Sequence, residues 1–132
     1  MDYVILGAGP AGVTAAETIR QHDAKGKITL IGGEAEQPYS RMAIPYLLDG
    51  RIGESGTHLR QQPGHYEQHR IEYITGRAGG VDAKGRKLHL DGGRVLPYDK
   101  LLIATGASPL VPRMEGAHLP GVHTCWPLPD AR

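Results

Sequence analysis

Three glycines near the start of the chain have the spacing with which a backbone can hold a phosphate group. Gly7, Gly9 and Gly12 follow the short apolar run 4–6 and lead into residues 10–22, which have helical periodicity. Gly7 permits a tight turn, Gly9 lacks a Cβ and so lets a diphosphate approach the backbone, and Gly12 lets the helix pack closely on the strand. The start of such a helix presents free N–H groups and a positive dipole end. The pattern predicts the diphosphate-binding turn of a dinucleotide site.

The residues after this helix favour the same interpretation. A second apolar strand is expected at residues 27–31, and Glu34 lies just past it, about 20 residues beyond Gly12. In dinucleotide-binding β-α-β units, an acidic residue at this spacing accepts hydrogen bonds from a ribose. All parts of the dinucleotide-binding unit are present in order: strand, glycine turn, helix, second strand and acid. A glycine-rich turn of some other α/β protein is therefore a much poorer explanation.

Composition limits the classes of partner. The 132 residues contain 15 Lys and Arg against 14 Asp and Glu, which gives no excess charge for binding nucleic acid or a membrane surface. No apolar run is long enough to span a bilayer, and the first one lacks the basic flank of a secretory signal. The single cysteine excludes an internal disulfide and favours a reducing compartment. We therefore expect one domain at most, in a cytoplasmic protein.

The rest of the chain predicts an α/β fold around this unit. Short helices are expected at residues 42–48 and 66–69, and a strand at 71–74. Residues 78–98 contain turn residues between short alternating runs, which predicts an antiparallel meander. Residues 100–106 have an unbroken apolar centre, which is typical of a parallel strand covered on both faces. The predicted fold class is a Rossmann-like β-α-β domain with a parallel sheet and an inserted antiparallel β-meander.

Other side chains capable of chemistry form weaker patterns. Cys125 and His123 would point to the same side of an extended segment, as a thiolate pair can, but no third group orients them. A lone cysteine is more commonly a small buried apolar residue. His65 and His69 are four residues apart, as two metal ligands on a helix can be, but solvated surface histidines are the simpler interpretation. We expect neither a catalytic residue nor a metal site in this chain.

Four segments of the sequence form a recognisable set: residues 7–12 (GAGPAG), 30–34 (LIGGE), 38–41 (PYSR) and 98–107 (YDKLLIATGA). Together they resemble the N-terminal part of the FAD-dependent pyridine nucleotide-disulfide oxidoreductase family. The chain is most similar to the branch of nitrite reductase large subunits and rubredoxin- or ferredoxin-reductase-like flavoproteins. The resemblance covers essentially the whole chain, and its first and last segments together are quite specific.

The resemblance implies that the chain holds FAD, and it assigns a role to each matched position. Glu34 would accept hydrogen bonds from the adenosine ribose, Arg41 would lie near the phosphates or the flavin edge, and Ala78 would offer backbone contacts to adenine. Residues 104–106 would line FAD at the carboxyl end of a strand, where ligands of parallel sheets bind. The implied cofactor-binding residues are Gly7, Gly9, Pro10, Ala11, Gly12, Glu34, Arg41, Ala78, Ala104, Thr105 and Gly106.

Members of the family have parts that this sequence lacks: a second glycine fingerprint for NAD(P)H, a returning FAD segment and a C-terminal interface domain. We therefore expect a fragment, with residues 1–110 as its FAD-binding segment and 111–132 leading toward an NAD(P)H-binding domain. The full-length parent would pass electrons from NAD(P)H through FAD to an external acceptor, for instance an electron-acceptor protein. The 132 residues alone would not turn over.

Met42 stands where many members of the family have a redox cysteine. A thioether forms neither a thiolate nor a disulfide, so disulfide or peroxide reduction by that route is not expected. The plainer interpretation, that Met42 packs in the core, is compatible with this one.

Two alternatives remain open from the sequence. The glycine loop would hold NAD(P) if the chain were part of a simple dehydrogenase, although its place at the N-terminus and residues 104–106 favour FAD. The chain would otherwise be a non-catalytic module that binds a partner or forms a homodimer, because an incomplete parallel sheet leaves edges exposed.

Overall fold

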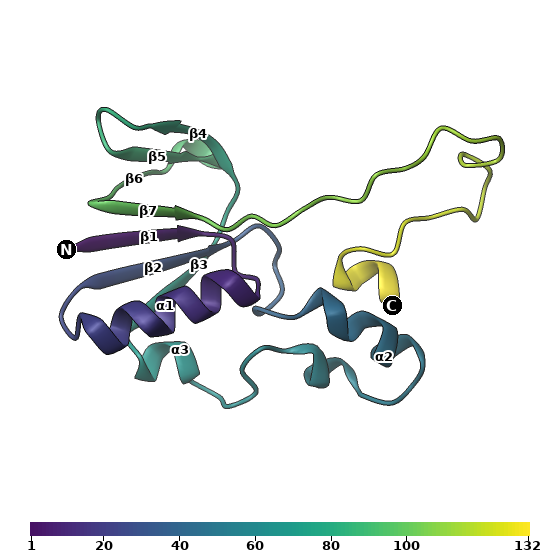
Figure 1. Cartoon of the computed structure of the whole chain (residues 1–132), viewed down its shortest axis with the longest axis horizontal. Coiled ribbons are helices and arrows are strands. Elements are labelled where there is room, and N and C mark those ends of the chain that lie inside the picture. Colours follow the sequence, from purple (N-terminus) through teal and green to yellow (C-terminus); the bar gives the residue numbers. More distant parts are fainter.

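The structure is a computed structural model that describes residues 1–132, and it has two sheets (Figure 1). In chain order, with η for 3₁₀ helices, the elements are β1 (Asp2–Leu6), α1 (Pro10–His22), β2 (Lys27–Gly32), η1 (Arg41–Ala43), α2 (Ile44–Leu48), η2 (Glu54–Thr57), α3 (His65–Gln68), β3 (Ile71–Thr75), β4 (Ala78–Asp82), β5 (Lys87–Leu90), η3 (Asp91–Gly93), β6 (Val95–Pro97), β7 (Lys100–Ile103) and η4 (Leu128–Ala131). A parallel sheet has the strand order β3-β2-β1-β7, and an antiparallel sheet has the order β4-β5-β6. The predicted fold class is confirmed.

The predicted β-α-β unit is formed by β1, α1 and β2. Pro10 lies in the first turn of α1, where its missing N–H costs no helical hydrogen bond. Asp23 caps the other end, and its carboxylate accepts the backbone N–H of Gly26 at 2.7 Å, which turns the chain into β2. Val13 and Ala16 lie three residues apart on α1, and both are buried against the sheet.

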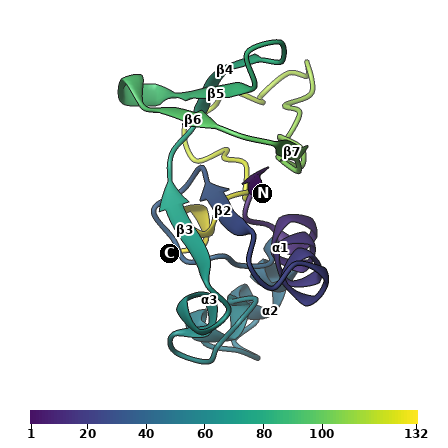
Figure 2. The ribbon, with the colours of Figure 1, turned by 90° about the vertical axis from the view of Figure 1, so that its left-hand side faces the viewer.

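The two faces of the parallel sheet are covered by different layers, and Figure 2 shows α1 and the meander on opposite sides of it. Successive side chains of a strand alternate between faces, so Ile5 packs with α1 while Val4 and Leu6 pack with the meander. The α1 side is formed by Ile5, Val13, Ala16, Ile28, Leu30 and Ile71. The meander side is formed by Val4, Leu6, Ile31, Leu88 and Leu90.

One expectation about β7 is wrong. β7 does pair in parallel with β1, but it is the edge strand of the sheet, and Leu102 and Ile103 are 40% and 61% exposed. Only Leu101 packs against the meander. An apolar run shows only that a strand is able to be buried on both faces. Burial itself requires other elements to pack on those faces, and α1 packs on β1 and β2 rather than on β7.

A salt-bridge cluster holds the segment before α3 against α1. Arg60 donates two hydrogen bonds to the Glu17 carboxylate, at 2.7 and 2.6 Å, and His65 Nε2 lies 2.8 Å from the same group. The bonds from Arg60 lower the pKa of Glu17 below its usual value. The His65 side chain is only 13% exposed, so its assignment as a solvated histidine is wrong, whereas His69 is exposed.

After β7 the chain extends away from the sheets and then returns, as Figure 1 shows in green and yellow. The return ends in η4, where the fully buried Leu128 packs with Tyr39 and Ile44. The longest helix, α1, has 13 residues, and none of the helices combines the length and apolarity needed to cross a bilayer.

Candidate functional site

The carboxyl ends of four parallel strands bring most of the predicted site residues to one edge of the sheet. The turn after β1 lies between its neighbours: Gly7 donates its N–H to Ile31 O at 2.8 Å, and Ala104 donates to Leu6 O at 2.7 Å. The glycine turn, the residues after β2 and the residues after β7 therefore lie side by side. This edge is where open α/β sheets bind ligands.

The three glycines of the turn differ in how much room surrounds them. A Cβ on Gly7, whose φ is +116°, would collide with the carbonyl of Ala104, and a Cβ on Gly12 would collide with the carbonyl of Gly7. A Cβ on Gly9 would meet no heavy atom within 4 Å. Gly7 and Gly12 are thus required by internal packing, while Gly9 presents bare backbone to open space, as a diphosphate cradle requires.

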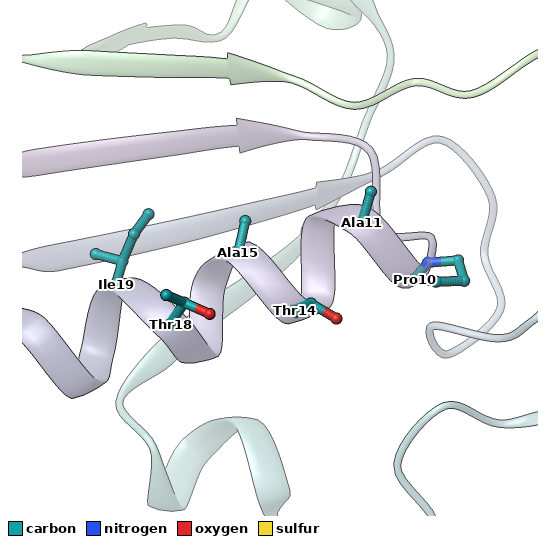
Figure 3. Close-up of a pocket in the computed structure, with 6 residues that line it drawn as sticks. All are labelled: Pro10, Ala11, Thr14, Ala15, Thr18 and Ile19. Atoms are coloured by element: carbon teal, nitrogen blue, oxygen red, sulfur yellow. The ribbon is translucent and has the colours of Figure 1, made fainter.

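The first turn of α1 points free donors at this space. The first helical hydrogen bond runs from Val13 N–H to Gly9 O, so the N–H groups of Ala11 and Gly12 have no helical acceptor. The first turn contains no acidic side chain, and no side chain caps it. Figure 3 shows Pro10 and Ala11 at this end of the helix, beside an open hollow that continues along Thr14 and Ala15. The helix start therefore suits an anion.

Glu34 and Arg41 meet beside the end of β2. Arg41 Nη2 forms an ion pair with Glu34 Oε1, and the hydroxyl of Tyr39 donates to Glu34 Oε2 at 2.6 Å. A carboxylate has about four acceptor sites, so Glu34 can still accept ribose hydroxyls. Arg41 has five donors, its side chain is 34% exposed, and its one hydrogen bond goes to Glu34. The pair therefore keeps both acceptor and donor capacity for a nucleotide.

The phenol of Tyr39 links this pair to the end of the chain. Besides donating to Glu34, its oxygen accepts the buried N–H of Leu128 at 3.0 Å. Burial raises the pKa of Tyr39 to about 12, and the hydrogen bond to Glu34 acts in the same direction.

A Tyr39→Phe variant is expected to unfold more easily at neutral pH. The change leaves the N–H of Leu128 without an acceptor, which costs about 1–3 kcal/mol of unfolding free energy. Since the folded-state pKa of Tyr39 lies above its usual value of 10, its contribution is complete below pH 10 and is lost as the pH rises toward about 12. In urea unfolding, the difference in unfolding free energy between the wild-type and Tyr39→Phe chains should shrink over this pH range. Tyr66, whose pKa burial also raises to about 12, is the same in both chains, and a difference that stays constant would contradict the role of Tyr39.

The other predicted site residues lie along the same edge. Ala78 begins β4 directly after Arg77, whose side chain lies beside Gly33 at the end of β2. Thr105 and Gly106 follow β7 and are exposed. That these residues touch a cofactor stays a prediction.

Sequence reasoning missed two aromatic residues of this site. Tyr39 lies within the segment of residues 38–41, two residues before Arg41, and its place in that segment was the available signal. Trp126 lies far along the chain, yet its ring centroid is 5.5 Å from the guanidinium carbon of Arg41. No local pattern links them, because only the return of the chain after β7 brings them together.

Three side chains with possible chemistry lie apart from this arrangement. Met42 is 81% exposed, so the expectation that it packs in the core is wrong. Cys125 is a free, exposed thiol, which corrects the expected burial. No three His, Cys, Asp or Glu side chains come together as metal ligands, and His65 is engaged by Glu17.

Similar proteins match this chain along nearly its whole length. The sequence is 36% identical over 138 residues to an NADH oxidase from Methanocaldococcus jannaschii, covering 100% of this chain and 31% of that protein. It is 34% identical to the ferredoxin–NAD(+) reductase component of the p-cumate 2,3-dioxygenase system of Pseudomonas putida, covering 97% of this chain and 32% of that one. The chain thus spans about a third of the length of these curated relatives.

A solved structure shares both the fold and the sequence pattern. A ferredoxin reductase from Rhodopseudomonas palustris superposes with a TM-score of 0.88 at 32% identity, covering 98% of this chain and 32% of that one. The family model described as pyridine nucleotide-disulphide oxidoreductase matches residues 1–130. Because the family model matches nearly the whole chain, the chain belongs to the pyridine nucleotide-disulphide oxidoreductase family.

Proposed function

We propose that this chain is the FAD-binding part of an NAD(P)H-dependent flavoprotein oxidoreductase that passes electrons to an external acceptor. The observation that carries the proposal is the bare backbone at Gly9, which lies at the start of α1 with Glu34 and Arg41 near the adjoining strand end. The named activities of the similar proteins, NADH oxidase and ferredoxin–NAD(+) reductase, support a redox role for the full-length protein.

In this proposal the residues of the chain bind and orient the nucleotide. The backbone N–H groups of Ala11 and Gly12 donate to the diphosphate, since the helix leaves them without acceptors. Glu34 accepts the ribose hydroxyls, and the partly exposed Arg41 donates to the phosphates or lies at the flavin edge. Ala78 and residues 104–106 supply backbone along the same edge of the sheet.

The flavin would supply the hydride and electron chemistry when bound. The chain engages Glu34, Arg41 and Tyr39 in bonds with one another at this edge, and none of the three is assigned a catalytic step. Its part in the reaction is to hold the nucleotide, with residues 1–110 as the binding segment and 111–132 as a connection toward an NAD(P)H-binding domain.

The nucleotide retained by the purified chain tests the choice of FAD over NAD(P). The chain is mixed with equal amounts of FAD and NAD⁺, desalted and then denatured to release what it holds. We expect a yellow protein that releases flavin, because the turn opens at the end of β1 beside residues 104–106. Release of NAD⁺ without flavin would make the chain a piece of a dehydrogenase and overturn the proposal.

Self-association is a second candidate, and the exposed β7 favours it. The edge strand leaves Leu102 and Ile103 open, and unpaired strand edges attract further strands. A second copy of the chain would cover this surface in a homodimer. A particle mass in solution equal to one chain would weigh against it.

A further inference from the structure

The last seven residues of the chain return to the predicted nucleotide site and are fastened there. The side chain of Leu128 is fully buried with Tyr39 and Ile44. Its N–H is bonded to the Tyr39 hydroxyl. Residues 126–132 are therefore attached to the same phenol that contacts Glu34.

Two further sets of polar contacts hold this segment in place. The backbone N–H of Trp126 donates to Asp130 Oδ2 at 3.0 Å, which fixes the turn that carries the indole. Arg132 forms hydrogen bonds with Glu36, at 2.9 and 3.1 Å, and with Glu54, at 2.6 and 3.1 Å. The segment is thus tied to the loop after β2 and to η2, and Figure 1 shows it beside α2.

The indole of Trp126 contacts the arginine of the site. The guanidinium carbon of Arg41 lies 5.5 Å from the centroid of Trp126 and 5.5 Å from that of Tyr39, both within the range of cation–π attraction. With Glu34 holding Nη2 as well, the side chain has three restraints on its position. A free arginine samples many rotamers, and binding a ligand requires that this freedom be lost.

We propose that residues 126–132 form a strap over the nucleotide site and that Trp126 is its positioning residue, which holds Arg41 in place for the phosphates. The inference rests on the proposed function, since it needs a nucleotide at the edge of β1 and β2. It adds a segment that the glycine fingerprint does not contain. The strap pre-organises Arg41, so the nucleotide need not immobilise that side chain itself.

The test uses ADP, which has the adenine, ribose and diphosphate of FAD but no flavin. In calorimetric titrations, Trp126→Ala is expected to weaken ADP binding about fivefold to tenfold, as expected for one side chain that is no longer pre-organised. Trp126→Phe keeps an aromatic ring and should stay within about threefold of the wild-type chain. Unchanged ADP affinity in Trp126→Ala would overturn the proposal.

A double-mutant cycle with Arg41→Ala separates positioning from a merely structural role. If Trp126 acts through Arg41, then Trp126→Ala should weaken binding no further once Arg41 is already alanine. An equal loss in both backgrounds would overturn the proposal. Failure of the wild-type chain to bind either ADP or FAD is a different result, and it would instead refute the proposed function.

Fluorescence provides a readout that does not depend on how the variants fold. Trp126 is the only tryptophan of the chain, so its emission reports on the strap alone. We expect saturating ADP to change this emission in the wild-type chain, because the nucleotide alters the charge and contacts of Arg41 beside the indole. Emission that stays constant while calorimetry shows ADP bound would overturn the proposal.

Discussion

A Gly9→Val chain is expected to fold normally and to lose most of its affinity for FAD. A Cβ at this position meets no heavy atom within 4 Å, and the φ of −77° with extended ψ is open to any residue. The same side chain would fill the space in which the diphosphate should contact the backbone. We expect binding to weaken at least about 100-fold, roughly 2.7 kcal/mol, in a flavin titration.

The control for this prediction is the thermal unfolding midpoint without nucleotide. It should stay close to that of the wild-type chain, because an open-surface substitution changes stability by only about 0.5 kcal/mol. Gly9→Val protein that still binds FAD at wild-type strength would show that the diphosphate lies elsewhere, and the cofactor assignment would fail with it.

Unlike Gly9→Val, Gly12→Ala is expected to lower the stability of the fold strongly, although it adds only a single methyl group. Its Cβ would overlap the carbonyl oxygen of Gly7. Because this oxygen belongs to the backbone, it cannot move aside by changing a side-chain rotamer. Overpacking of this kind costs about 3 kcal/mol, and the better helix propensity of alanine returns at most about 1 kcal/mol. The steric term wins, and the unfolding free energy should fall by about 2 kcal/mol.

Thermal unfolding measures this loss. For a chain of this size, about 2 kcal/mol corresponds to a midpoint lowered by about 6–10 °C. Gly9→Ala is the matched control, since the same substitution three residues earlier meets only open space and should leave the midpoint in place. If Gly12→Ala and Gly9→Ala unfolded at the same temperature, the close contact between α1 and the turn after β1 would be wrong.

Much of this fold follows from local patterns. The helix at Pro10–His22 follows from its periodicity and from a proline where helices tolerate one. The meander follows from short alternating runs between turn residues. The parallel pairing of β7 also follows from its apolar run, whereas the exposure of Leu102 does not, because cover depends on where other elements lie.

The candidate site also has some features that follow from local sequence and others that depend on tertiary structure. Glycine spacing and the acid at position 34 are short-range features, so the sequence by itself determines the strand-turn-helix and predicts a nucleotide-binding turn with a ribose acceptor. The pattern also assigns Gly9 to the diphosphate and Gly12 to close helix packing, but it does not say which atoms crowd Gly7 and Gly12. Those contacts depend on distances between β1, α1 and β7, so only the tertiary structure decided that Gly7 faces the carbonyl of Ala104.

The surroundings of Arg41 were likewise decided only by the tertiary structure. Tyr39 is a neighbour in sequence, but Trp126 and Leu128 reach the site because the chain leaves the sheet after β7 and comes back. Contacts between such distant residues depend on the path of the whole chain rather than on any local preference. For this reason the turn was visible in the residues themselves, while the strap that closes over Arg41 was not.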